Sequence, residues 1–167
     1  AHSEPRLLAE GATFLLLGKP QEIKLVQGTK AGVEVKQGVA SVCTGASGDT
    51  SAAAIERTLT KWLRDKAVQQ LNFSVNVYAP RVGAVPTNVE VKAYKARWGS
   101  CQPDGRLQFN WRLIHAPISI LDYVVIHELC HLLEHNHSPA FWRHVERVAG
   151  DFKRSRDWLK DNGWRLS

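Results

Sequence analysis

Residues 123–137 read YVVIHELCHLLEHNH, and residues 127–131 within them form the pattern HExxH. On an α-helix, residues four positions apart differ by about 40° in direction and about 6 Å in rise, so the imidazoles of His127 and His131 can converge on one ion. Glu128 is turned about 100° from His127, too far round for an easy ligand, but it can reach a water beside the ion. The stretch predicts a helix carrying two zinc ligands and a general base.

The alternative is a helix whose histidines are ordinary core or surface groups. Two imidazoles and a carboxylate would then lie in the apolar context YVVIHELCHLL. Buried polar groups are normally hydrogen-bonded, and this context offers them few partners. Neutral imidazole nitrogens are common zinc ligands, so we prefer the metal-binding interpretation.

A third ligand should follow, because catalytic zinc has three protein ligands and one open position. His135 continues the same helical face but lies about 12 Å from His127 along an unbroken helix, so it cannot share the ion. His137 can return to the ion if the chain reverses at residues 134–136, where Asn136 tolerates the left-handed conformation that closes helices. We predict His137 as the third ligand, and one Zn²⁺ per chain.

The spacing of the three histidines equals that of the metzincin motif HExxHxxGxxH, but Glu134 replaces its glycine, so a metzincin fold is not implied. Two alternatives for the third ligand remain, Glu146 in the manner of gluzincins and His144. Cys101 and Cys130 are further potential ligands, and packing as small residues is the interpretation we prefer for them.

Outward from HExxH, apolar periodicity and breakers predict helices over residues 117–134, 138–150 and 151–163. Upstream, alternating sequence predicts the strands Val89–Tyr94 and Arg106–Ile114. The other predicted elements are a helix Ser51–Phe73, a breaker segment Pro80–Pro86, a turn-rich connection Ala96–Gly105, and the short strands Thr13–Leu17, Gln21–Val26, Gly32–Val35 and Val39–Cys43.

Length and composition fit one globular domain. The chain has 167 residues, of which 44% are apolar and 23% charged, which excludes a mainly disordered chain. No apolar run reaches the roughly 18 residues that span a bilayer. We predict a single catalytic domain over 1–167 with an α+β fold and a small mixed sheet, in which residues 1–48 are strand-rich and 49–167 hold the helix, hairpin and HExxH core.

Three cysteines are too few for a disulfide scaffold, and their odd number favours a reducing, cytoplasmic location. The N-terminus lacks the features of a signal peptide, and the chain contains no Met, so we expect a processed or truncated product.

The net charge of +6 favours anionic partners such as nucleotides or nucleic acid, although a solvated basic face is the simpler interpretation. After Ser138 the chain carries seven Lys or Arg against four acids. Trp142, Trp158 and Trp164 are interleaved with them, as in proteins that bind single strands. Helical spacing favours the core for these tryptophans.

The sequence also resembles the YgjP-like metallopeptidase family, in the stretches RWGSC (97–101), FNWRLI (109–114), DYVVIHELCH (122–131) and NHSPAFW (136–142). These are metal-dependent hydrolases of the zincin type, similar in motif to SprT-like and WLM-type proteases. The resemblance is specific over about 97–163 and weaker over 13–91, and family members usually carry further N-terminal strands. It implies a zincin-like, minigluzincin-type domain, with the three histidines on zinc and Glu128 in catalysis.

The segment RWGSC is interpreted as a tight turn in which Trp98 packs and Gly99 permits a positive φ. Arg97 can instead bind an anionic group of the substrate. The candidates for a second oxyanion donor are Arg97, Tyr123 and His135.

Together these residues predict a zinc-dependent hydrolase, foremost a metallopeptidase in which Glu128 takes a proton from water and passes it to the leaving amine. The strand Arg106–Ile114 is a candidate for pairing with an extended polypeptide substrate. One alternative is a nucleotide phosphohydrolase of the nucleoside triphosphate pyrophosphatase type, with Arg97 and Arg112 clamping phosphates. Another is a nucleic-acid-associated module with structural zinc, which an intact Glu128 disfavours.

Overall fold

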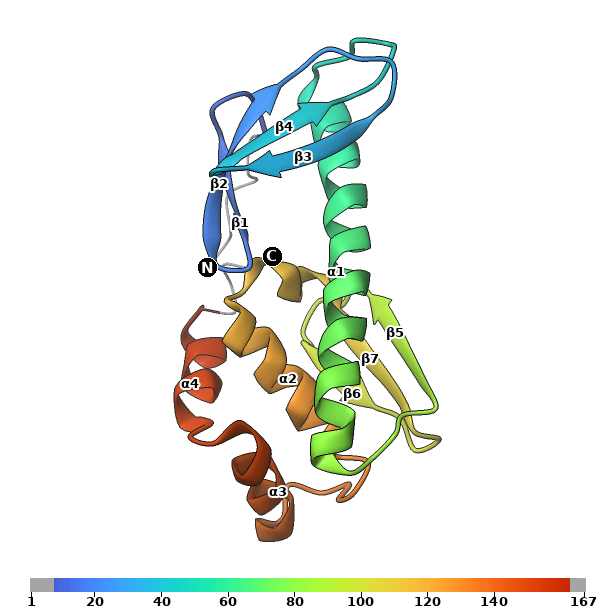
Figure 1. The fold of residues 1–167 in the computed structure, drawn as a ribbon, viewed down its shortest axis with the longest axis vertical. Coiled ribbons are helices and arrows are strands. Elements are labelled where there is room, and N and C mark those ends of the chain that lie inside the picture. The colour runs from blue at the N-terminus through green and yellow to red at the C-terminus, as the bar shows by residue number, and fades with distance from the viewer. Residues whose placement is uncertain (1–7, 163–167) are drawn as a thin grey trace.

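A computed structural model describes residues 8–162, and one long helix, α1 (Ala52–Val82), runs the length of the molecule (Figure 1). Its 31 residues correspond to about 46 Å. Ser51 caps its start by accepting a hydrogen bond from the Ala54 amide, and Gly83 closes its end with a left-handed φ of 85°. The helix therefore braces both ends of the fold.

The predicted end of this helix at Phe73 is wrong, because α1 continues for two and a half more turns. Val75, Ala79 and Val82 are buried at helical spacing and extend the apolar stripe beyond Phe73. Pro80, which we expected to break the chain, lies within the last turn of α1. Tertiary burial outweighs the weak helix propensity of this segment.

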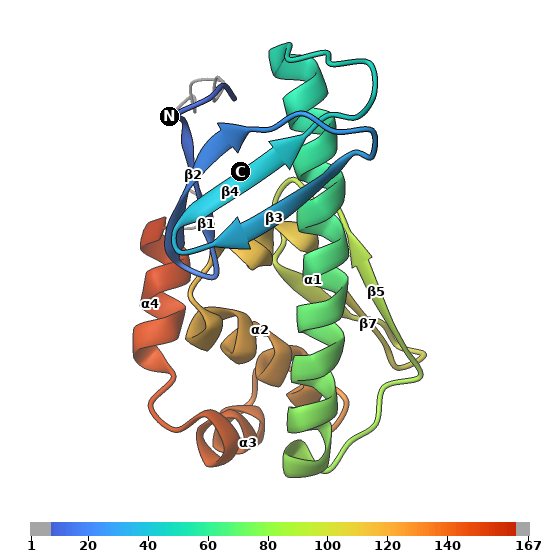
Figure 2. The ribbon, with the colours of Figure 1, turned by 45° about the horizontal axis from the view of Figure 1, so that its top comes forward.

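The N-terminal strands form a four-stranded sheet that lies across the upper half of α1 (Figure 2). Its order is β1-β2-β4-β3, with β2 and β4 parallel and the other pairs antiparallel. Phe14, Ile23, Ala40 and Val42 are buried on its inner face. The bounds are β1 (Thr13–Leu16), β2 (Lys19–Leu25), β3 (Gly32–Lys36) and β4 (Val39–Cys43), close to the predicted strands.

The turn between β1 and β2 is attached to a segment about a hundred residues later. The amides of Leu17 and Gly18 donate to the carbonyls of Ile114 (2.7 Å) and His115 (3.0 Å). Gly18 has a φ of 80°, and a Cβ there would lie 3.0 Å from a side-chain carbon of Pro117. Only glycine fits this close approach, so the first hairpin is held at the start of the next helix.

The second sheet has three strands, β5 (Asn88–Lys92), β6 (Gly99–Cys101) and β7 (Arg106–Asn110), in the order β5-β7-β6. β5 is parallel and β6 antiparallel to β7. β6 falls inside the connection that we predicted to be only turns. The fold is α+β as predicted, but it contains two small mixed sheets rather than one.

The predicted strand Arg106–Ile114 is wrong in two respects. β7 ends at Asn110, whose side chain accepts a hydrogen bond from the Arg112 amide at 3.1 Å and caps a 3₁₀-helix, η1 (Trp111–His115). β7 is also the central strand, paired on both sides, so it has no free edge for a substrate. Among the described strands of this sheet, β6 and β5 are the edges.

Three helices complete the chain: α2 (Ile118–Cys130), α3 (Pro139–Ala149) and α4 (Lys153–Asn162). Asp122 of α2 accepts hydrogen bonds from Ser74 (2.7 Å) and Tyr78 (3.2 Å) of α1. Trp164 and the predicted helix end at Gly163 lie outside the described residues. Over the described range, none of the helices is both long and apolar enough to cross a membrane.

Candidate metal centre

Three histidines converge at the end of α2. The Nε2 atom of His137 lies 3.1 Å from Nε2 of His131 and 3.2 Å from Nε2 of His127. Two nitrogens held about 2.0–2.1 Å from one tetrahedral zinc ion would lie about 3.3 Å apart, so the three side chains fit a single ion. The ligand atoms of these three histidines lie close enough together to hold a metal ion. In the described part of the chain, no other group of three His, Cys, Asp or Glu residues does so.

The early end of α2 brings His137 to the other two. We predicted that the helix runs to about Glu134 and closes with a left-handed Asn136. Instead α2 ends at Cys130, and the amides of Leu132 and Leu133 make tighter, 3₁₀-type bonds to the carbonyls three residues before them. Asn136 does not have a positive φ. The reversal thus begins about four residues earlier than expected and needs no left-handed residue.

The backbone of this turn also orients the His131 ring. Nδ1 of His131 donates to the Glu134 carbonyl at 3.0 Å, which leaves its Nε2 to face the other two histidines. The ring of Phe141 stacks on His131 with centroids 4.3 Å apart. Together the hydrogen bond and the ring contact fix the imidazole plane.

The electrostatics favour neutral imidazoles, the form that binds metals. Burial and the neighbouring His131 and His137 lower the pKa of His127 to about 3. Burial is also the main cause that lowers the pKa of His131. At neutral pH these two rings carry no charge that would repel a cation.

Glu128 is 6% exposed and is the buried carboxylate beside the histidines. Its Oε1 lies 3.8 Å from Nε2 of His127, and its Oε2 is buried with no hydrogen-bond partner in the protein. Burial raises the pKa of Glu128 to about 7, with Arg97 opposing the rise. A partnerless buried oxygen beside a cluster of ligands calls for a water or ion next to it.

Gly99 of the edge strand β6 packs closely against the side chain of Glu128. A Cβ on Gly99 would lie 3.0 Å from Cγ of Glu128 and 3.2 Å from both the Gln108 carbonyl and the Phe109 ring. Gly99 does not have a positive φ, so our interpretation of it as a turn glycine is wrong. Its missing side chain makes room for Glu128.

Asn110 holds the segment that leads into β6. It is 3% exposed, and its Nδ2 donates to the carbonyls of Tyr94 (3.2 Å) and Arg97 (3.0 Å). The backbone N–H of Asn110 donates to the Trp98 carbonyl at 2.9 Å. Sequence reasoning missed Asn110, because a buried asparagine at the end of a strand looks like an ordinary turn residue.

A polar network on the opposite face of the three-stranded sheet ties β6 to its neighbours. Oε1 of Gln108 accepts from Tyr94, Ser100 (3.3 Å) and Gln102 (3.2 Å), and its Nε2 donates to Glu90 at 2.9 Å. The hydrogen bond from Gln108 is the main cause that lowers the pKa of Glu90 to about 2. The network links all three strands.

Aromatic side chains line another side of the histidine cluster, and we call Tyr123, Trp142 and Phe152 the aromatic wall. Trp142 stacks on His137 with centroids 5.7 Å apart, and Phe152 stacks on Trp142 at 4.8 Å. Tyr123 stacks on Phe152 at 6.4 Å and meets His127 edge-on at 5.9 Å. Phe152 has no sequence signal beyond its place after a helix cap.

The remaining candidates lie apart from the three histidines. Arg112 packs over the Trp111 ring at 5.0 Å, and burial lowers its pKa. His135 is exposed and stands outside the cluster. The alternative ligands and the two cysteines are likewise not among the three clustered residues: His144, Glu146, Cys101 and Cys130.

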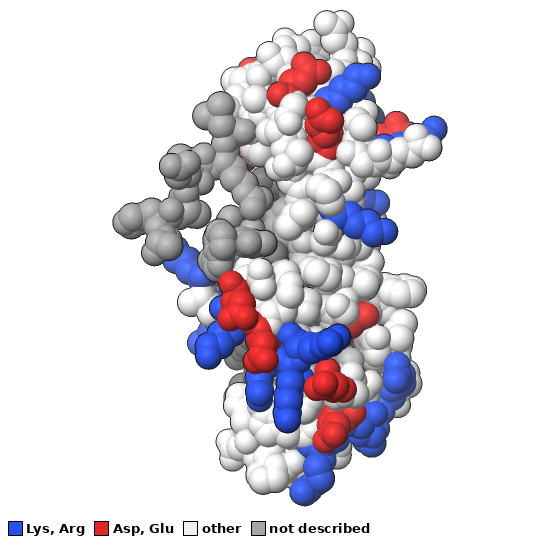
Figure 3. Space-filling model, turned by 90° about the vertical axis from the view of Figure 1, so that its left-hand side faces the viewer, with Lys and Arg blue, Asp and Glu red and all other residues white. Residues whose placement is uncertain are grey.

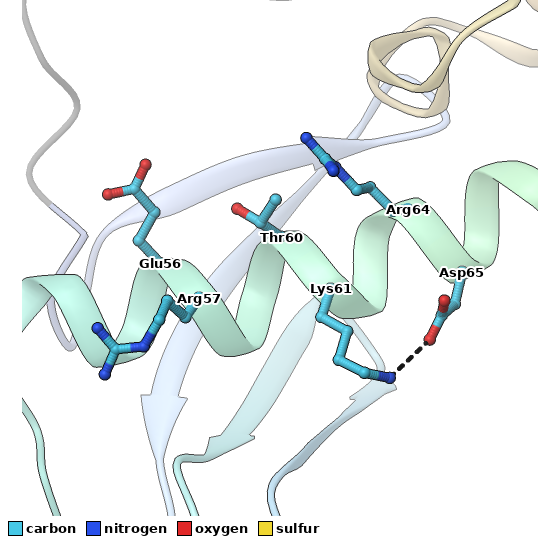
Figure 4. A pocket seen from close by; sticks show the side chains of 6 residues that line it. All are labelled: Glu56, Arg57, Thr60, Lys61, Arg64 and Asp65. Carbon is cyan, nitrogen blue, oxygen red and sulfur yellow. Dashed lines mark hydrogen bonds and ion pairs between the residues drawn. The ribbon is translucent and has the colours of Figure 1, made fainter. Parts of the chain in front are cut away.

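A hollow of about 480 Å³ on α1 is not a second candidate. All the side chains that line it come from the exposed face of one helix, and Lys61 pairs with Asp65 there at 3.2 Å (Figure 4). Such exposed pairs contribute little energy. The hollow lies on the N-terminal half of α1, whereas Ser74 and Tyr78, which bond to α2, lie in its C-terminal half.

An HExxH helix whose histidines meet a third from the following turn, under a mixed sheet, defines a metallopeptidase of zincin-like fold. The family model described as "YgjP-like, metallopeptidase domain" matches residues 1–162, and the chain belongs to this family. It is therefore a hydrolase of the metal-dependent peptidase class.

A solved structure supports the fold. The chain is similar to the crystal structure of the metallopeptidase zymogen abylysin from Pyrococcus abyssi, with 21% sequence identity and a TM-score of 0.50. The likeness covers 57% of this chain and 94% of that one. No curated protein matches the chain significantly.

Proposed function

We propose that the chain is a zinc-dependent peptidase in which His127, His131 and His137 hold one zinc ion and Glu128 is the general base. The observation that carries the proposal is the convergence of three Nε2 atoms next to a buried carboxylate, one oxygen of which has no partner. Nitrogen donors in this number suit zinc and leave a position open. A bound zinc ion polarises a carbonyl oxygen and lowers the pKa of a neighbouring water.

The chain's own residues perform the proton transfers. Oε2 of Glu128 accepts a proton from the attacking water and returns it to the leaving amine. A pKa raised toward 7 by burial suits both transfers at neutral pH. Gly99, whose added Cβ would lie 3.0 Å from Cγ of Glu128, leaves room for this side chain beside His127.

The edge strand β6 is our candidate for binding an extended polypeptide. The Trp98 carbonyl and the Gln102 amide bond to β7, so by alternation the backbone groups of Gly99 and Cys101 point to the free edge. An extended chain can pair with such an edge. Arg97, exposed beside β6, and Tyr123, in the aromatic wall, remain our candidates for contacting the developing oxyanion.

Charge alone does not favour a nucleic-acid partner. On the face that carries α3 and α4, Lys and Arg side chains alternate with Asp and Glu rather than forming a continuous basic surface (Figure 3). The metal site is accordingly the feature on which the function depends.

The test is the variant Glu128→Gln, loaded with zinc and assayed against an unfolded protein and nucleoside triphosphates in parallel. We expect the wild type to cleave the polypeptide and the variant to retain zinc while losing about 10²–10⁴-fold of the rate. Loss of zinc in the variant would make Glu128 a ligand instead. Hydrolysis of the triphosphates alone would replace the peptidase with a phosphohydrolase.

A further inference from the structure

A guanidinium group covers the aromatic wall. Cζ of Arg156, in α4, lies 5.8 Å from the centroid of Trp142 and 5.6 Å from that of Phe152. Arg156 is exposed, and among residues 8–162 no carboxylate pairs with it. A cation this close to two aromatic rings is attracted by both, and its N–H groups stay available to another partner.

This guanidinium is close to the metal centre. The Trp142 ring beneath it stacks on His137, and the Phe152 ring stacks on Tyr123, which meets His127 edge-on. Trp142 also meets His127 edge-on, with centroids 5.8 Å apart, so one of the two rings near Arg156 contacts both His137 and His127 directly. A substrate bound at the histidines would reach Arg156 with a residue close to the cleaved bond.

A groove of about 800 Å³ runs along the same rings. Trp142 and Phe152 line it together with the cations Arg143 and Lys153. Two acids, Glu146 and Asp151, line it as well. The side chain of Asp151 accepts a hydrogen bond from the backbone N–H of Lys153 at 3.2 Å. The groove thus offers apolar surface for a side-chain stem, and because its two cations are matched by two acids, Arg156 beside the rings is the cation left to bind the end of that side chain.

We infer that Arg156 and the rings of Trp142 and Phe152 form a subsite for a carboxylate of the peptide substrate, which gives the enzyme a preference for acidic residues near the cleaved bond. This inference rests on the proposed peptidase function. A planar guanidinium binds a carboxylate through two parallel hydrogen bonds, and the rings beside it exclude water from that pair. The carboxylate belongs to an Asp or Glu side chain or to the C-terminus of a short peptide.

The experiment compares peptides that differ only in Glu or Gln at one scanned position, each with a free or an amidated C-terminus. We expect the zinc-loaded wild type to prefer the Glu peptides about two- to fivefold in kcat/KM, the range of an exposed ion pair. Arg156→Gln should remove this preference and leave the Gln peptides unchanged. If Glu and Gln peptides are cleaved alike but amidation lowers kcat/KM for both, and Arg156→Gln removes that difference, the carboxylate is the C-terminal one.

Arg154→Gln is the matched control, because Arg154 is exposed on the same helix and makes no ring contact among the described residues. It should leave the preference intact. An equal loss in both variants would reduce the effect to general charge and overturn the subsite. A wild type that prefers neither Glu over Gln nor a free over an amidated C-terminus would overturn it too.

A binding measurement separates the subsite from the peptidase function. Labelled Glu and Gln peptides are titrated against Glu128→Gln and against Glu128→Gln/Arg156→Gln, with fluorescence anisotropy as the readout. Tighter binding of the Glu peptide that is lost with Arg156 supports the subsite even if the wild type hydrolyses no peptide. If the wild type hydrolyses peptides but Glu and Gln peptides bind equally well, the peptidase function is supported and the subsite is overturned.

Discussion

The two sheets are both small and both mix parallel with antiparallel strands, yet only the three-stranded sheet reaches the metal centre. Its edge strand β6 touches Glu128 through Gly99, and a polar network around Gln108 holds that strand from the opposite face. The four-stranded sheet packs Ile23 and Val42 into the core and braces α1. One sheet contacts Glu128, our proposed general base, whereas the other packs the core, so mutations in the two should have different consequences.

Removing the metal should give the largest difference between the two regions, because the proposed metal site lies beside the three-stranded sheet and away from the four-stranded one. At a free zinc concentration about a thousand times Kd, binding adds about 4 kcal/mol to the free energy of unfolding. Chelation should therefore lower the melting temperature and speed hydrogen exchange at the end of α2, while amides of β2 and β4 keep their local protection. In His137→Ala, added zinc should stabilise far less.

His135→Ala is the control for that experiment, since His135 is two residues away and outside the cluster. It should respond to zinc as the wild type does. If His135→Ala loses the response and His137→Ala keeps it, the assignment of the third ligand is wrong.

A pair of glycines on edge strands sharpens the comparison. An added Cβ at Gly99 meets Glu128, whereas at Gly32, on the edge strand β3, it meets nothing within 4 Å. Gly99→Ala should lower kcat about 10²-fold by displacing the carboxylate, with zinc content unchanged. Gly32→Ala should leave kcat as it is. Equal kinetics for the two variants would show that β6 does not position Glu128.

In the four-stranded sheet, a core substitution should lower stability and leave kcat unchanged. Val42 is fully buried, so Val42→Ala should cost about 2 kcal/mol of unfolding free energy and lower the melting temperature by about 4–8 °C. Its kcat, measured where the variant is folded, should equal that of the wild type. A drop in kcat would contradict the division of roles between the sheets.

The smallest effect concerns the pH dependence of the network. The pKa of Glu90 is lowered from 4.5 to about 2, so its ionised form stabilises the fold above pH 4.5 and this contribution is lost as pH falls through about 2. Glu90→Gln should destabilise the protein at pH 7, and the difference from the wild type should shrink below pH 4.5. Urea unfolding of both proteins at several pH values measures this difference in unfolding free energy.

Glu34→Gln, on the exposed edge strand β3, is the matched change in the other sheet. Its difference in unfolding free energy from the wild type should not follow the same pH curve. If both substitutions give the same curve, the network around Gln108 is not the cause.

The closeness of the three histidines was more predictable from the sequence than the surrounding fold, for physical reasons. Helical geometry alone brings His127 and His131 together, and a reversal before Ser138 was enough to return His137. The length of α1 was not predictable, because its last turns depend on Ser74 and Tyr78 bonding to Asp122, more than forty residues away.

The same limit applies to the residues around the site. The contact of Gly99 with Glu128 joins two elements that are separate in the sequence, so the glycine was read as a turn residue. Phe152 and Arg156 reach the site because α4 folds back beside α2, which the local pattern of charges does not reveal. Residues within one helix are predictable from spacing, and residues that meet across elements are not.

The attachment of the β1–β2 turn to η1 has a consequence for synthesis. The carbonyl of Leu15 pairs with Nδ1 of His115, a hundred residues later. At about 5–20 residues per second, translation needs about 5–20 s to supply that partner after the hairpin emerges. During this interval β2 can pair with β4, but the β1–β2 turn lacks its partner and remains exposed to chaperones and proteases until residues 114–117 leave the ribosome. Slowing translation between the two segments should lower the yield of folded protein.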